Sequence, residues 1–184
     1  MPKSLRVADG DIYFLLGNEI QWSKGSRYLS SYEEAKLGLK PIAATVDADG
    51  VYWAVPSASG VAVMTFDQDT RKKLGFVPDG NVRYGFVTTK THVVVRDDVH
   101  GRIVAFAKSG DQKAIVVEEN DEAYDFASDD DGVYWRSKKG LVTCNPDATN
   151  VRVLVPTVSV TGGVSVTKDT IYYGFDGAVF ALAK

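Results

Sequence analysis

The side chains best suited to acid–base chemistry are two histidines and the aspartates that precede one of them. His100 follows Asp97 and Asp98 in a segment with the composition of a turn. Asp98 could therefore polarise the His100 imidazole, as a general base requires. His92 falls in an apolar segment, which favours a structural role. No nucleophile stands at a recognisable spacing, and neither a His-Glu-x-x-His nor a phosphate-binding glycine motif occurs, so we assign no catalytic residue.

The densest group of carboxylates is the run Asp129-Asp130-Asp131-Gly132. An EF-hand type of calcium loop ending there would need an acid where Ala127 stands and a glutamate where Lys138 stands. Aspartate and glycine also serve tight turns, through side-chain hydrogen bonds to the backbone and through positive φ. We therefore predict a structural turn, with no metal and no cofactor; a looser site of carboxylates and carbonyls is the alternative.

The same acidic run belongs to a repeat, in which a turn rich in Asp and Gly precedes an aromatic residue. The first aromatic residue of each copy defines an anchor, with Val94 in its place in one degenerate copy, and successive anchors are 39, 42, 40 and 38 residues apart. The anchors are Tyr13, Tyr52, Val94, Tyr134 and Tyr172.

Each repeat has room for short strands joined by tight turns. Fourth strands are predicted at 27–30, 73–77, 114–117 and 151–155, whereas the last repeat ends before one. A single helical turn is predicted to begin at Ser31 and to end by Gly38. Four strands in about 40 residues are typical of a β-propeller blade.

We therefore predict an all-β protein, a β-propeller of about five four-stranded blades with a three-stranded last blade. The alternative is an incomplete six-bladed propeller completed by another chain. The whole of 1–184 forms one domain in this interpretation, with repeat units at approximately 3–40, 41–80, 81–121, 122–159 and 160–184.

Two segments carry a resemblance to known propellers, Val46 to Trp53 and Ser128 to Trp135. Both resemble the repeat of the low-density lipoprotein receptor type, with its Tyr-Trp strand, and of the related TolB-like propellers. The Thr-Asp that follows in the receptor repeat is replaced here by Ala54-Val55 and Arg136-Ser137. The second segment also has the spacing of the Asp-box of sialidase-like propellers. The resemblance implies the propeller architecture and carries over no partner.

One position in the repeat contains an unexpected carboxylate. Nine residues before the five anchors stand Ser4, Ala43, Gly85, Asp125 and Gly163. Strands nearest a propeller axis are crowded, which gives small residues there a packing reason. Asp125 is therefore expected to be buried near the axis, where a carboxylate must be paired or hydrogen-bonded. Backbone amides of a neighbouring blade are one expected partner, and a ligand or ion in the channel is the other.

The loops between blades and those between second and third strands share one face of a propeller. The candidate binding residues on this face and at the channel mouth are Arg83, Tyr84, Asp98, His100, Tyr124, Asp125, Arg136 and Lys138.

Composition narrows the classes of function. The net charge of −3, with both signs interspersed, argues against a nucleic-acid binder. The apolar run Ile12 to Leu16 is too short to span a bilayer, so we expect no membrane insertion and a soluble protein. Cys144 is the only cysteine, which excludes an intrachain disulfide and predicts a buried apolar side chain. A natural start at Met1 implies the cytoplasm, and a removed signal peptide implies secretion or the periplasm.

Three functions remain from the sequence. The first is a non-catalytic binding or scaffold propeller that engages a protein, or a glycan as the second choice, through the loop face. The second is a hydrolase or lyase with a polar site at the channel, using Asp98, His100 and Asp125. The third is a structural subunit of a larger assembly, with a homo-oligomer formed through the incomplete last blade.

Overall fold

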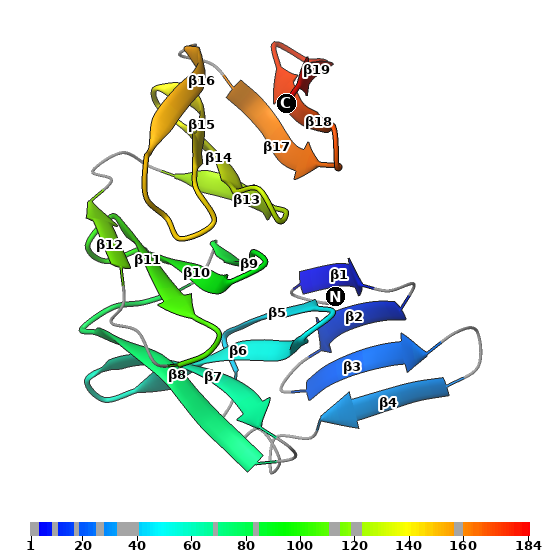
Figure 1. The fold of residues 1–184 in the computed structure, drawn as a ribbon, viewed down its shortest axis with the longest axis vertical. Coiled ribbons are helices and arrows are strands. Elements are labelled where there is room, and N and C mark those ends of the chain that lie inside the picture. The colour runs from blue at the N-terminus through cyan, green and yellow to red at the C-terminus, as the bar shows by residue number, and fades with distance from the viewer. Residues whose placement is uncertain are drawn as a thin grey trace. The chain divides into compact units, whose positions relative to one another are not determined.

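The computed structural model describes residues 4–8, 11–16, 19–24, 28–32, 41–67, 70–82, 85–110, 115–118, 123–156 and 160–184. The chain divides into two compact units, Met1–Arg83 and Tyr84–Lys184. Each unit is built from antiparallel sheets, and within each sheet the strands that pair are consecutive in sequence (Figure 1).

The first unit contains two four-stranded sheets. Their strands are β1 (Ser4–Ala8), β2 (Asp11–Leu16), β3 (Glu19–Lys24), β4 (Tyr28–Tyr32), β5 (Ala43–Asp47), β6 (Gly50–Ser57), β7 (Gly60–Asp67) and β8 (Thr70–Pro78). Ser31 and Tyr32 belong to β4, so the predicted helix cap at Ser31 is wrong. The rest of that predicted helical turn lies outside the described residues. The polar side chains of this segment allow either structure, and pairing with β3 decides in favour of a strand.

The second unit contains two four-stranded sheets and one three-stranded sheet. The strands are β9 (Phe86–Thr88), β10 (His92–Asp97), β11 (Arg102–Ala107), β12 (Ile115–Glu118), β13 (Tyr124–Ser128), β14 (Val133–Ser137), β15 (Gly140–Cys144), β16 (Arg152–Pro156), β17 (Val160–Val166), β18 (Thr170–Phe175) and β19 (Ala178–Ala183). The predicted fourth strands are confirmed as β4, β8, β12 and β16, and the last sheet has three strands as expected.

The aspartate turns repeat the same hydrogen bonds in two sheets. The Oδ1 atom of Asp47 accepts from the amides of Asp49 at 2.9 Å and Gly50 at 3.2 Å. In the second unit, Asp129 Oδ1 accepts from the amides of Asp131 at 2.9 Å and Gly132 at 3.1 Å. These bonds satisfy backbone groups that the tight turn leaves without ladder partners. The prediction of a tight turn at the acidic run is thereby confirmed.

The repeat also places the largest core residues. Trp53 and Trp135 are fully buried and follow their aspartate turns at the same spacing. Trp53 packs against Phe66 with ring centroids 4.6 Å apart, and Trp135 stacks on Phe126 at 5.7 Å. Cys144 lies in the same core cluster as Trp135, which confirms the predicted buried thiol. Burial raises the pKa of Cys144 to about 12.

Strand β19 forms the outer edge of the last sheet and carries exposed apolar side chains. Val179 is 77% exposed and Phe180 is 42% exposed. Phe180 contacts the rings of Tyr173 and Phe175, at centroid distances of 5.7 and 5.8 Å. This aromatic group therefore packs along one face of β18 and β19 while Val179 remains in solvent.

Candidate functional site

Among the described residues of the second unit, a connected polar group surrounds the ring of Tyr124. Two guanidinium groups lie over this ring, that of Arg96 at 5.7 Å and that of Arg136 at 5.2 Å from its centroid. Tyr124 begins β13, Arg96 is near the end of β10, and Arg136 is near the end of β14. Guanidinium groups at this distance are attracted by the negative face of the ring.

Each of these arginines also binds a carboxylate. Arg96 Nη1 forms an ion pair with Asp98, and both side chains are largely buried. The Nε and Nη2 atoms of Arg136 both lie 3.0 Å from Asp125 Oδ2. The Arg136 and Asp125 side chains are 27% and 41% exposed, so solvent reaches this second pair. We call Arg96, Asp98, Tyr124, Asp125 and Arg136 the Tyr124 cluster.

The structure corrects the expected burial of Asp125. The ladder between β13 and β14 shifts between Tyr124 and Ala127, so that Asp125 and Phe126 together oppose Trp135. Phe126 is buried on Trp135, whereas Asp125 has a φ of 54° and an exposed side chain. A bulge of this kind turns the extra residue away from the regular alternation of faces. Asp125 is thus paired with Arg136 of the same sheet at the surface, and not buried.

Two of the other positions nine residues before an anchor differ in crowding: Gly85 is tightly surrounded and Gly163 is not. A Cβ atom on Gly85 would lie 2.7 Å from Arg96 Cβ and 2.9 Å from the ring of Phe126, as the predicted packing reason requires. The Gly85 carbonyl also accepts from the Arg96 amide at 2.7 Å, which fixes the end of β10. Gly163, in contrast, has open space around its Cβ position, and the expectation is wrong there. The bulge in β17 moves the crowded position to Gly162, which faces Gly174.

His100 is held by Asp97 and not by Asp98, as the sequence had suggested. The fully buried Asp97 places Oδ2 at 2.6 Å from His100 Nδ1 and at 2.8 Å from Arg102 Nε. Asp98 binds Arg96 instead. The imidazole of His100 is 40% exposed. Asp97 was missed because it ends the buried strand β10, and residue type alone does not say which of two adjacent aspartates points back toward the turn.

The remaining candidates are placed as follows. Lys138 is exposed in the turn between β14 and β15, two residues beyond Arg136. Arg83 and Tyr84 lie outside the described residues. The structure therefore brings Asp98, Tyr124, Asp125 and Arg136 into one cluster, and it puts His100 in the same turn as Asp98. Arg96 completes the cluster and was not predicted, because a single arginine at the end of an apolar strand resembles a solvated strand end.

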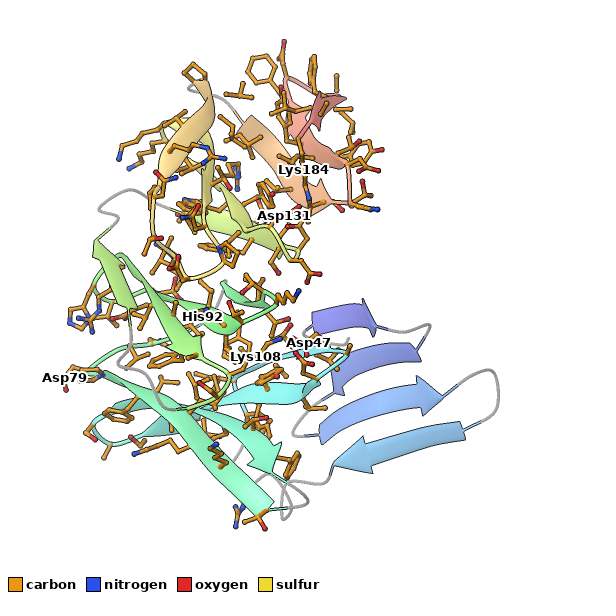
Figure 2. All side chains as sticks on the ribbon, viewed as in Figure 1. Asp47, Asp79, His92, Lys108, Asp131 and Lys184 are labelled. Carbon is orange, nitrogen blue, oxygen red and sulfur yellow. The ribbon has the colours of Figure 1, made fainter. Side chains whose placement is uncertain are left out.

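One lysine, Lys184, lies beside the carboxylates of the acidic run. Lys184 Nζ forms an ion pair with Asp129, lies 3.9 Å from Asp131 Oδ2 and stands 5.4 Å from the centre of the Tyr134 ring (Figure 2). An ammonium group therefore lies beside two of the carboxylates in the acidic run. Within the described residues, no group of three or more His, Cys, Asp or Glu side chains is placed to hold a metal ion. Nor does that part of the chain contain a helix long and apolar enough to cross a membrane.

His92 lies at the opposite end of β10 from Asp97 and is buried. Its Nδ1 is 2.8 Å from Thr91 Oγ1, and its buried Nε2 has no hydrogen-bond partner among the described residues. Burial lowers the pKa of His92, and the charge of Lys108 adds to this shift while Asp147 opposes it (Figure 2). His92 is therefore a neutral structural side chain with an unfavourable charged form.

We expect this burial to make the second unit less stable in mild acid. The unfolded chain binds a proton at His92 as the pH falls through about 6.5, while the folded chain, with its lowered pKa, does not yet do so. The free energy of unfolding therefore falls with falling pH, until the pH drops below the folded pKa as well. Urea unfolding from about pH 7.5 to about pH 5 measures this slope, and it should be shallower in His92→Gln. Equal slopes in the two proteins would contradict the role given to His92.

These sheets define the class of protein. Consecutive antiparallel meanders of three or four strands are blades of a β-propeller. No family model matches the chain, and no curated protein sequence matches it.

Solved structures identify the fold. A catalytically inactive H270A virginiamycin B lyase from Staphylococcus aureus, with quinupristin, is similar with a TM-score of 0.68 and 15% identity, over 100% of this chain and 70% of that one. The nidogen/laminin complex is similar with a TM-score of 0.64 and 16% identity, over 97% of this chain and 74% of that one. AztD from Citrobacter koseri is similar with a TM-score of 0.64 and 10% identity, over 99% of this chain and 68% of that one.

The chain therefore has the β-propeller fold. Its likeness to the receptor-type propeller seen in the sequence is confirmed at the level of fold by the nidogen structure. At these identities the comparisons establish the fold alone. The chain spans 64 to 70% of the length of the first three lyase structures that it matches, so its five blades correspond to part of those propellers.

Proposed function

We propose that this chain is a binding module that engages a protein partner through the surface of the Tyr124 cluster. The observation that carries the proposal is the Tyr124 ring with two guanidinium groups over it, each held by its own carboxylate. Tyrosine and arginine dominate the binding energy of protein interfaces. A glycan is the second choice of partner, because an aromatic ring beside charged groups also suits a sugar.

The cluster is organised before any partner arrives. Arg136 is fixed by Asp125 and by the ring, so it loses less side-chain freedom on binding than a solvated arginine would. Exposed ion pairs such as this one add little to stability, typically below about 1 kcal/mol. Stability therefore gives a weak reason for the arrangement, and recognition gives a stronger one.

Among the similar structures, one is a complex between nidogen and laminin. That example supports the use of such a fold for protein binding and names no partner for this chain. Self-association through β19 stays a prediction, supported by the exposed side chains of Val179 and Phe180.

The binding function is tested with Tyr124→Ala and Arg136→Ala in the full chain. We expect each change to weaken the binding of a captured partner by about tenfold or more, because truncation of a tyrosine or arginine anchor typically removes over 1 kcal/mol. The dissociation constant is measured by calorimetry or surface plasmon resonance on a partner isolated with the unchanged chain.

Lys168→Ala is the matched control, since Lys168 is an exposed cation of the same unit in the turn between β17 and β18. Circular dichroism confirms that all variants are folded. If the Tyr124 and Arg136 variants bind with the affinity of the control, the Tyr124 cluster is not the contact surface.

A further inference from the structure

The turn that carries His100 departs from the pattern of the other blades. The paired residues that close the corresponding turns are Ser57 with Gly60, Ser137 with Gly140, and Phe175 with Ala178, each with two residues between them. The β10–β11 turn closes with Asp97 and Arg102 and has four residues between them. His100 is one of the four residues in this longer turn. Gly101, whose φ is 64°, is the last residue before β11.

The carboxylate of Asp97 has one oxygen more than the turn needs. In the blade of β14 and β15, the single hydroxyl of Ser137 accepts from the Lys139 amide at 3.0 Å, two residues on. Asp97 Oδ1 accepts from the Val99 amide at 3.1 Å, also two residues on. A serine therefore satisfies this part of the turn. The second oxygen, Oδ2, is available to bind His100 and Arg102.

The hydrogen bond to Asp97 fixes the protonation pattern of the imidazole. In the neutral imidazole, a carboxylate acceptor beside Nδ1 favours the tautomer with the hydrogen on Nδ1 and the lone pair on Nε2. Among the described residues, Asp97 is the only hydrogen-bond partner of the His100 ring. A fully buried carboxylate thus orients an imidazole that is 40% exposed to solvent.

We propose that His100 and Asp97 form a catalytic base that hydrolyses carboxylic esters. This arrangement orients the imidazole and stabilises the imidazolium that forms when Nε2 takes up a proton. Arg102 is a positioning residue, because it donates to the same oxygen of Asp97 and holds the carboxylate in place. The site is independent of the binding function proposed for the Tyr124 cluster.

Water is the nucleophile in this reaction. His100 Nε2 removes a proton from a water molecule as the water oxygen forms a bond to the acyl carbon. The tetrahedral intermediate then collapses, the bond between the acyl carbon and the ester oxygen breaks, and the imidazolium returns the proton to that oxygen. One ester and one water give one carboxylic acid and one alcohol, and His100 ends in its starting form. Esters suit such a base because an alcohol leaves more readily than an amine.

The proposal is tested with ethyl dichloroacetate as the probe, because an imidazole acts as a general base on alkyl esters with such a leaving group, and with the variants His100→Gln and Asp97→Ser. Asp97→Ser introduces at position 97 the residue type that Ser137 provides at the end of β14. It keeps an acceptor for the turn but removes the oxygen that orients His100. We expect His100→Gln to abolish the hydrolysis that exceeds the background, and Asp97→Ser to lower it by about tenfold or more. The reaction of the unchanged chain should be slower in D2O, since a proton moves in the rate-limiting step.

Lys168→Ala controls for acylation of surface lysines by the probe and should react like the unchanged chain. Should Asp97→Ser fail to fold, Asp97→Asn takes its place, because its single side-chain oxygen can accept from the Val99 amide or from His100 but not from both. The ring nitrogens of His100, observed by NMR, give a readout besides activity: Nδ1 should be protonated in the unchanged chain and lose this preference in the Asp97 variant.

Two results would overturn the proposal. Equal rates for the unchanged chain and His100→Gln would show that the imidazole does not act on the ester. Equal rates for the unchanged chain and Asp97→Ser, with the NMR preference unaltered, would show that Asp97 only closes the turn.

Discussion

Replacing Trp135 with alanine lowers the free energy of unfolding of the second unit by about 3 to 5 kcal/mol, the largest effect that we expect from one side chain. Trp135 is fully buried, stacks on Phe126 and shares a core cluster with Val142 and Cys144. Removal of the indole leaves a cavity that paired strands on both sides of β14 prevent from closing. Urea unfolding followed by far-ultraviolet circular dichroism measures the change.

Trp135→Phe is the control for this prediction. The indole Nε1 is buried and has no hydrogen-bond partner among the described residues, so phenylalanine loses volume but no polar contact. We therefore expect a cost well below that of alanine. A stability of Trp135→Ala close to that of Trp135→Phe would mean that the core repacks around the missing ring. It would contradict the expectation that the paired strands beside β14 keep the cavity open.

Substitution of two adjacent glycines should have opposite effects. A Cβ atom on Gly162 would lie 2.8 Å from Gly174 Cα, in the backbone of the paired strand, whereas Gly163 has nothing within 4 Å. Gly162→Ala therefore forces β17 and β18 apart, at a cost of about 1 to 3 kcal/mol. Gly163→Ala removes freedom from the unfolded chain without a clash and should be neutral or stabilising, by up to about 1 kcal/mol.

The two alanine variants form a matched pair, because they change the same residue type one position apart in one strand. Thermal unfolding of both, beside the unchanged chain, measures the difference between them. Equal melting temperatures for the two variants would show that β17 is not held as closely to β18 as the facing glycines indicate.

The repeat in the sequence was sufficient to predict the strands and their order. Buried Trp53 and Trp135 and the turn aspartates Asp47 and Asp129 recur at fixed offsets, because each blade must solve the same packing problem. Fixed offsets fail where a strand gains a residue. The bulge at Asp125 turned an expected axial carboxylate into a surface ion pair.

Contacts between individual side chains were harder to predict from the sequence than the strands themselves. The choice of Asp97 over Asp98 for His100 depends on the direction in which a longer turn folds back, which no residue type encodes. Likewise, Arg96 lies over Tyr124 from another strand, next to Gly85, whose missing side chain leaves room for Arg96 Cβ. The first feature depends on the path of a local turn, and the second on a contact between segments that are 28 residues apart in sequence.

The single buried thiol makes this chain convenient for spectroscopy. Cys144 is 3% exposed, and with a pKa of about 12 it carries almost no thiolate at neutral pH. Thiolates are the species that react with maleimides and iodoacetamides. A cysteine introduced at the surface, for example at Lys168 or Lys138, would therefore be the only site that takes a fluorophore or spin label. Pairs of such labels can report distances between blades without removal of the native residue.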